Sequence, residues 1–272
     1  MKVKKTLFLI AITTFLSFSG NTFCQIPVST ENQSWGTYFN EAGLDGTFVL
    51  QNLQTRKSTV YNSERAEIRY LPASTFKIMN TLIGLENNTV SNIDEVFKWD
   101  SIQRPYESWN QDLSLREAFK VSAVWVYQEL ARRTGRPAIE YWIEKCGYGN
   151  KKTGPQIDRF WLNGEIAISA NEQIEFLRLL IQEGLPFSRS VQQQVKQIMF
   201  TDSVPGKKLY AKTGWAARIE KQIGWYVGFV EDGQNTWIFA INIDIKNPED
   251  TRYRTEISRK ILDSEGIYPT GN

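Results

Sequence analysis

The chain has 272 residues, with 32 lysines and arginines against 30 acidic residues, and it contains no histidine. The lack of histidine excludes Ser-His-Asp and Cys-His mechanisms and removes a principal zinc ligand. Hydrophobic residues make up 41% of the chain and charged residues 23%, which is ordinary for a globular protein of one large domain or two closely packed lobes. A serine enzyme built from this chain must therefore take its base from a lysine, a tyrosine or a carboxylate.

The first residues are typical of a secretory signal peptide. Lysines precede an apolar run over residues 7–18, which is too short for a membrane span. Cys24 leaves a lipoprotein alternative open, although residues 21–23 match a lipobox poorly. Removal of residues 1–24 takes away three lysines and no acid, so the net charge moves from +2 to −1. We predict an exported, periplasmic protein without affinity for nucleic acid and without a disulfide, because Cys146 would then have no partner.

Strand patterns lie at both ends of the mature chain, with helical patterns between them. Residues 35–42 suit a short amphipathic helix, and residues 47–50 and 58–61 suit a strand hairpin. Later segments are bounded by capping residues, glycines and prolines at the positions where helices and hairpins begin and end. They predict helices over 123–134, 137–146, 169–182 and 189–199, strands over 208–212, 223–230 and 236–245, and a closing helix over 250–264.

This order of elements predicts an α/β (α+β) fold, with an antiparallel sheet built from both chain ends and a mainly helical lobe. The sheet lobe would cover about residues 25–70 and 201–272, and the helical lobe about residues 71–200. No linker separates them, so we predict one domain over residues 25–272.

The segment Leu-Pro-Ala-Ser-Thr-Phe-Lys over residues 71–77 carries the first sign of chemistry. Pro72 ends the preceding segment and an apolar helical pattern follows it, so Ser74 should lie in the first turn of a buried helix. Lys77 lies three residues on, on the same face and within reach of the serine oxygen. The pattern Ser-x-x-Lys alone is short, and it fits an N-cap serine and a solvated lysine equally well.

Four further short segments follow along the chain: Ser122-Ala123-Val124, Tyr148-Gly149-Asn150, Phe160-Trp161-Leu162 and Lys212-Thr213-Gly214. Each of them taken alone has an ordinary structural explanation as a turn, a helix cap, a core anchor or the end of a strand. We expect Lys212-Thr213-Gly214 to end a strand and present a cation at a sheet edge.

Together with Ser74-x-x-Lys77, these segments resemble the class D β-lactamases, the oxacillinases of the penicillin-recognising serine enzymes. The resemblance covers nearly the whole mature chain. Class A enzymes carry Ser-Asp-Asn where this chain has Ser122-Ala123-Val124, which favours class D. Flanking matches are Tyr70, Ile78, Val96-Phe97-Lys98-Trp99-Asp100 and Ser264-Glu265-Gly266-Ile267.

The resemblance implies that Ser74 attacks the lactam carbonyl and forms an acyl-enzyme, with the backbone N–H groups of Ser74 and Trp215 as oxyanion hole. Lys77 would be the general base, and in the family it is carboxylated by carbon dioxide. Ser122 would pass a proton to the lactam nitrogen. An apolar wall would keep the Lys77 amine neutral, made of Val124, Trp161 and Leu162.

The same resemblance implies a binding site for the substrate carboxylate. Lys212 and Thr213 would contact it, Gly214 would present backbone groups, and Arg254 would be the second cation. Arg252 and Arg259 are rivals for this last role. We expect no metal and no cofactor other than the carbon dioxide or bicarbonate that carboxylates Lys77.

The loop over residues 215–220 resembles that of carbapenem-hydrolysing oxacillinases, so we include carbapenem hydrolysis as a hypothesis. Two residues depart from that pattern. Trp215 stands where tyrosine is usual, and Asn163 stands where a carboxylate would pair with Arg218.

Other members of the same superfamily share the serine and lysine motifs. A peptidoglycan transpeptidase or carboxypeptidase is one alternative, and a β-lactam sensor domain that stays acylated is another. We expect neither, since the sequence shows no anchor, accessory domain or membrane span. The expected partner is a small-molecule β-lactam, and the expected state is a monomer or a homodimer.

Overall fold

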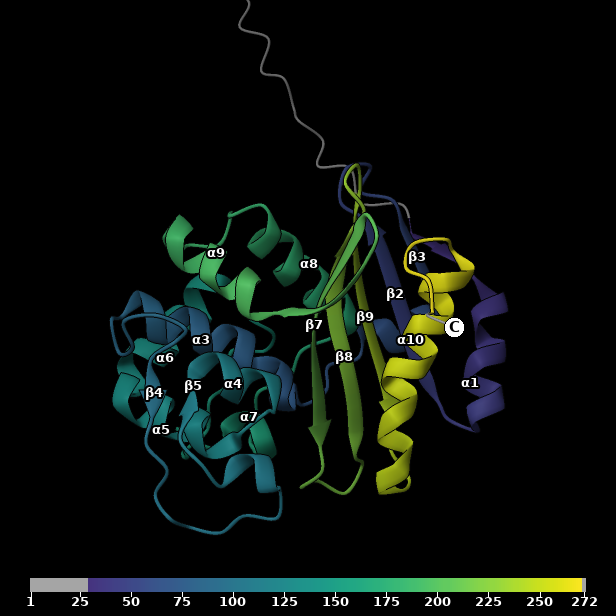
Figure 1. Ribbon diagram of the computed structural model, residues 1–272. Helices are drawn as coiled ribbons and strands as arrows, with labels where there is room; N and C mark the ends of the chain where they lie inside the picture. Colours follow the sequence, from purple (N-terminus) through teal and green to yellow (C-terminus); the bar gives the residue numbers. More distant parts are fainter. Residues whose placement is uncertain (1–28, 271–272) are drawn as a thin grey trace, which may run out of the picture.

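The computed structural model describes residues 29–270, and the expected signal peptide lies outside them (Figure 1). A seven-stranded sheet forms its centre, in the order β1-β3-β2-β9-β8-β7-β6. Adjacent strands are antiparallel except for β1 and β3, and β2 pairs with β9, which joins the two chain ends in one sheet. The strands are β1 (Ser29–Glu31), β2 (Gly46–Asn52), β3 (Ser58–Tyr61), β6 (Phe200–Val204), β7 (Lys207–Ala216), β8 (Ile223–Glu231) and β9 (Thr236–Asp244).

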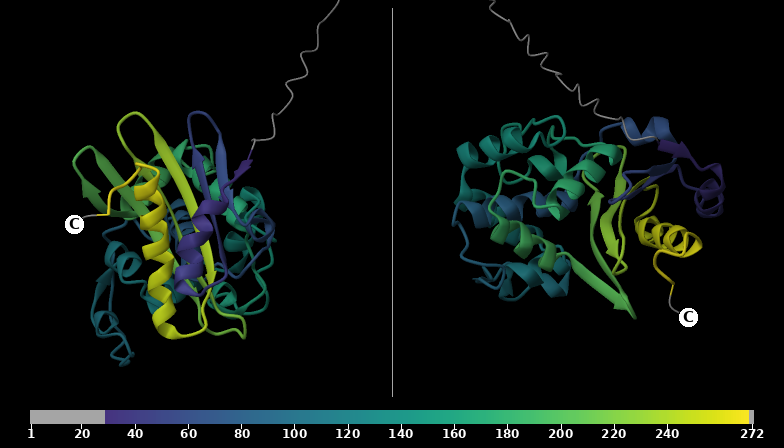
Figure 2. Two further views of the ribbon diagram at one scale, coloured as in Figure 1. Left: turned by 90° about the vertical axis from the view of Figure 1, so that its right-hand side faces the viewer. Right: turned by 90° about the horizontal axis from the view of Figure 1, so that it is seen from above.

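Helices cover both faces of this sheet (Figure 2). Helices α1 and α10 lie against one face, and the helical lobe lies against the other, with α8 packed on β2 and β9. A two-stranded sheet of β4 (Val96–Phe97) and β5 (Leu113–Ser114) belongs to the helical lobe. The helices are α1 (Gly36–Ala42), α2 (Ser63–Glu67), α3 (Lys77–Glu86), α4 (Leu115–Lys120), α5 (Val124–Thr134), α6 (Arg136–Cys146), α7 (Phe160–Asn163), α8 (Ala170–Ile181), α9 (Arg189–Ile198) and α10 (Tyr253–Ser264).

Strand β8 explains why the central sheet is buried on both faces. Its side chains alternate, so that Trp225, Val227 and Phe229 join the core of the helical lobe. Tyr226 and Val230 point the other way, into the core beneath α1 and α10. The strand therefore reads as a nearly continuous apolar run, as expected for a strand covered by helices on both sides.

The predicted fold class is confirmed, and the predicted elements occur with small shifts at their ends. The capping box of Ser169 and Glu172 opens α8 as expected. Strand β6 was not predicted, because residues 200–204 are short of apolar residues, with only Phe200 and Val204, and show no alternation of apolar and polar residues. Among residues 29–270, no helix has the length and apolarity needed to cross a bilayer.

Candidate active site

Ser74 lies in a short 3-10 turn, Ala73–Phe76, that leads directly into α3. In a 3-10 turn, side chains three residues apart lie one above the other. Lys77 therefore donates from Nζ to Ser74 Oγ across 2.9 Å. Ser74 thus lies in the turn that opens the helix, as predicted, and this turn has 3-10 geometry.

A cluster of buried aromatic side chains packs against this turn and holds it in place. The Phe76 ring packs edge-on against Tyr148 and Phe160, with ring centroids 5.5 and 5.0 Å apart, and stacks on Trp161 at 5.6 Å. Three of the sequence motifs thus meet at one buried side chain. Such packing holds the backbone of Ser74 in place, because a displaced ring would leave a void in the core.

Lys77 is completely buried. Burial, followed by the positive charge of Arg218, lowers the pKa of Lys77 to about 7. Its Nζ lies over the Tyr127 ring, 5.1 Å from the centroid. A substantial share of Lys77 is therefore neutral near pH 7, which a general base requires.

Ser122 and Lys212 form a second pair of a hydroxyl and an amine. Ser122 lies between α4 and α5 with φ of 58°, a left-handed conformation that non-glycine residues rarely adopt. Lys212 donates from Nζ to Ser122 Oγ, and also to the carbonyl oxygen of Thr213 at 3.0 Å. Burial, with the nearby charges of Lys77 and Arg254, holds the pKa of Lys212 well below its ordinary range.

Strand β7 runs close beside the Ser74 turn. A Cβ atom added at Gly214 would lie 2.9 Å from the carbonyl oxygen of Pro72 and 3.1 Å from Thr75 Cγ2. We predicted that Lys212-Thr213-Gly214 ends a strand. This was wrong, because β7 continues to Ala216. Strand β6 pairs with β7 only over residues 207–210, so residues 212–216 have one edge free of a strand.

A Gly214→Ala variant is therefore expected to lower the free energy of unfolding by about 1–3 kcal/mol, since the added methyl group meets backbone on the facing turn. The displaced turn should lower kcat/KM by about tenfold or more. Urea unfolding and steady-state kinetics measure both effects. Gly184→Ala is the control, because its methyl group has room. Equal behaviour of the two variants would contradict the close approach.

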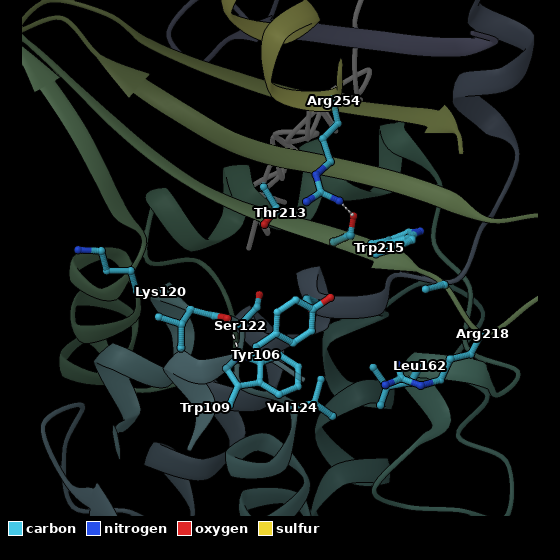
Figure 3. Close-up of a pocket in the computed structure, with 14 residues that line it drawn as sticks. Tyr106, Trp109, Lys120, Ser122, Val124, Leu162, Thr213, Trp215, Arg218 and Arg254 are labelled. Carbon is cyan, nitrogen blue, oxygen red and sulfur yellow. Dashed lines mark hydrogen bonds between the residues drawn. The ribbon is translucent and has the colours of Figure 1, made fainter. Parts of the chain in front are cut away.

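A cavity of about 510 Å³ opens at Ser74 between the two lobes (Figure 3). It brings together eight of the predicted site residues, while Lys77, Trp161 and Lys212 lie buried outside its lining. Figure 3 shows Arg254 reaching from α10 to β7, where its Nη1 donates to the carbonyl oxygen of Gly214 at 2.9 Å. The eight are Ser74, Ser122, Val124, Leu162, Thr213, Gly214, Trp215 and Arg254.

Comparisons with known proteins agree with this geometry. Residues 46–263 match the family model of the penicillin binding protein transpeptidase domain. The chain is 42% identical over 239 residues to β-lactamase OXA-48 of Klebsiella pneumoniae, covering 88% of this chain and 90% of that protein. The solved class D β-lactamase FUS-1 (OXA-85) of Fusobacterium nucleatum superposes with a TM-score of 0.85 and 43% identity, covering 88% of this chain and 99% of that one.

The chain belongs to the class D β-lactamases. A second solved class D enzyme, YbXI from Nostoc, also matches with a TM-score of 0.85 at 42% identity, over 87% of this chain and all of that one. The family resemblance read from the motifs is thereby confirmed, as is the assignment to the hydrolases. Its substrate is accordingly a small molecule.

Of the three candidate arginines Arg252, Arg254 and Arg259, one lies at the cavity of this class D β-lactamase. Arg254 lines the cavity, and burial lowers its pKa to about 10, so it stays charged at neutral pH. Arg252 is exposed and donates to the Tyr253 hydroxyl, while Arg259 pairs with Asp202 at 3.1 Å. Neither rival lines the cavity.

Asn150 of the class D motif serves as a scaffold in this β-lactamase. Its Nδ2 donates to the carbonyl oxygen of Glu165 at 2.7 Å, and its Oδ1 accepts from the backbone N–H of Ala167 at 3.0 Å. Gly149 has a positive φ, and a Cβ atom there would lie 2.1 Å from the Ala167 oxygen. This motif shapes the segment behind the site and does not line the cavity.

Six lining residues were not assigned to the site from the sequence. Tyr106 and Trp109 come from the irregular stretch between β4 and β5, and their rings pack 4.7 Å apart at the mouth of the cavity (Figure 3). The one hint in the sequence was the presence of two aromatic residues in a stretch without a helix or strand pattern. The other lining residues not assigned to the site from sequence are Lys120, Val121, Ala217 and Arg218.

Proposed function

We propose that Ser74 is the nucleophile with which this class D β-lactamase opens the lactam amide, and that Lys77 accepts its proton. The contact of 2.9 Å between Lys77 Nζ and Ser74 Oγ carries this proposal. Its pKa of about 7 lets Lys77 accept a proton near neutral pH. The serine oxygen then bonds to the lactam carbonyl carbon while the amide C–N bond breaks, which leaves an acyl-enzyme.

The departing lactam nitrogen needs a proton, and Ser122 is placed to supply it. Its hydroxyl lines the cavity and is held by Lys212 Nζ, which can return a proton to it. Thr213 and Arg254 flank the same region and suit the ring carboxylate, with the amine of Lys212 close behind them. Backbone N–H groups of Ser74 and Trp215 would stabilise the oxyanion.

We also propose that Lys77 is carboxylated by carbon dioxide, and the residues around it fit that group. The neutral amine would add carbon dioxide and lose one proton, giving a carbamate. Trp161 Nε1 is a buried donor without a partner among the described residues, and a carbamate oxygen would satisfy it. The carbamate would supply a carboxylate-like base at Ser74. Val124 and Leu162 shield the site from water.

Turnover of a chromogenic cephalosporin, oxacillin and imipenem tests these proposals. The enzyme without carbon dioxide is expected to recover activity when bicarbonate is added, and ¹³C-bicarbonate should give a carbamate signal in NMR that Lys77→Met lacks. Multiple turnovers of imipenem would establish carbapenem hydrolysis.

A single burst of product equal to the enzyme concentration, unchanged by bicarbonate, would contradict the proposal. It would favour a sensor or transpeptidase role instead. Export to the periplasm and the choice between monomer and homodimer stay predictions.

A further inference from the structure

A second cavity of about 260 Å³ adjoins the active-site cavity on the side of α7. Val124, Leu162 and Arg218 line both cavities, so the two share a wall. The second cavity is completed by Gln128, Arg159 and Asn163. None of the catalytic roles proposed for this enzyme uses the second cavity.

The guanidinium groups of Arg159 and Arg218 give this second cavity a positive charge. Among residues 29–270, no side chain makes an ion pair or a hydrogen bond with the guanidinium of Arg159 or Arg218. The nearby Asp158 is already bound to Arg132, with 2.7 Å between Oδ2 and Nη1. Asn163 contributes a neutral amide where a carboxylate would have compensated the charge. Within the part of the chain that the structure describes, no acidic residue lines either cavity.

The active site thus has a cationic group at each of two places. The guanidinium of Arg254 reaches from α10 to β7 beside Thr213, and Arg218 lies beside Leu162, away from them (Figure 3). In a penicillin, the ring carboxylate and the acylamino side chain project from opposite ends of the fused rings. With the ring carboxylate at Thr213 and Arg254, the acyl side chain extends toward Leu162 and Arg218.

We propose that Arg218, assisted by Arg159, binds a carboxylate on the acyl side chain of the substrate. The enzyme would then favour dianionic penicillins over their monoanionic counterparts. Guanidinium groups suit this role because their planar donors match a carboxylate in two parallel hydrogen bonds. This inference rests on the proposed function, because it needs the ring carboxylate to lie at Thr213 and Arg254.

Carbenicillin and benzylpenicillin form a matched pair for the test, since they differ by one carboxylate on the acyl side chain. The readout is the ratio of kcat/KM for carbenicillin to that for benzylpenicillin. Arg218→Gln is expected to lower this ratio about fivefold, and Arg218→Lys to retain most of it. The charge of Arg218 also acts on Lys77, but that effect is common to both substrates and cancels in the ratio.

Asn163→Asp provides an independent variant that keeps both arginines. A carboxylate at this position would compete with the substrate for Arg218, so the ratio should fall here as well. Arg159→Gln should lower it by a smaller factor. The control is Arg189→Gln, because that exposed guanidinium lies on α9, outside both cavities, and the ratio should not change.

An unchanged ratio in both Arg218→Gln and Asn163→Asp would overturn the inference. Loss of benzylpenicillin turnover in the wild-type enzyme would instead count against the proposed function, so the two failures are distinguishable.

Discussion

The Ser74→Ala variant is expected to lose turnover of a chromogenic cephalosporin by about 10⁵-fold or more, because the enzyme then has no nucleophile beside Lys77. Mass spectrometry after mixing with oxacillin should show an acyl adduct on the wild-type enzyme and none on the variant. The fold should be retained, since alanine fits the 3-10 turn and Ser74 Oγ accepts a hydrogen bond from no side chain other than Lys77 among the described residues.

The matched control is Ser190→Ala, which alters an exposed serine on α9. Its turnover should equal that of the wild-type enzyme. A Ser74→Ala enzyme that keeps more than about one per cent of the activity would show that another group attacks the lactam.

Lys77→Met is expected to abolish turnover while raising the free energy of unfolding at pH 7 by about 2 kcal/mol. The pKa of Lys77 is about 7 in the folded protein, against an ordinary value of 10.5. Below pH 7 the amine is charged in both the folded and the unfolded protein, so the full cost of burying that charge lowers the free energy of unfolding. Between pH 7 and 10.5 the unfolded chain binds the extra proton, so the penalty shrinks as the pH rises and vanishes above 10.5.

Urea unfolding in buffer free of carbon dioxide measures this effect. The stability gap between Lys77→Met and the wild-type enzyme should be larger at pH 7 than at pH 9.5. Added bicarbonate should narrow the gap, because a group that modifies only the folded state stabilises it. Lys57→Met, at an exposed position, should change stability by less than about 0.5 kcal/mol. A gap independent of pH would contradict the buried, neutral amine.

Local chemistry in the sequence was enough to predict much of this fold. The capping box at Ser169 depends only on residues close together in the sequence. The same is true of the glycines that follow helices and of the alternating pattern of the strands, so all three could be recognised from the sequence alone. Strand β6 escaped prediction because it is an outer strand held mainly by its pairing with β7. The absence of histidine and the order of the motifs led to the family, which the comparisons confirm.

The tertiary structure alone decided how the motifs work together. Sequence placed Lys77 three residues from Ser74, but its pKa follows from burial among side chains distant in the chain. The pairing of Lys212 with Ser122 joins residues 90 positions apart. Arg218, in the turn after β7, and Arg159, just before α7, likewise line one cavity only because the fold brings these two segments together. The burial of a side chain, the charges around it and its distance from other motifs depend on the whole fold. The residue types and their spacing along the chain depend on the sequence alone.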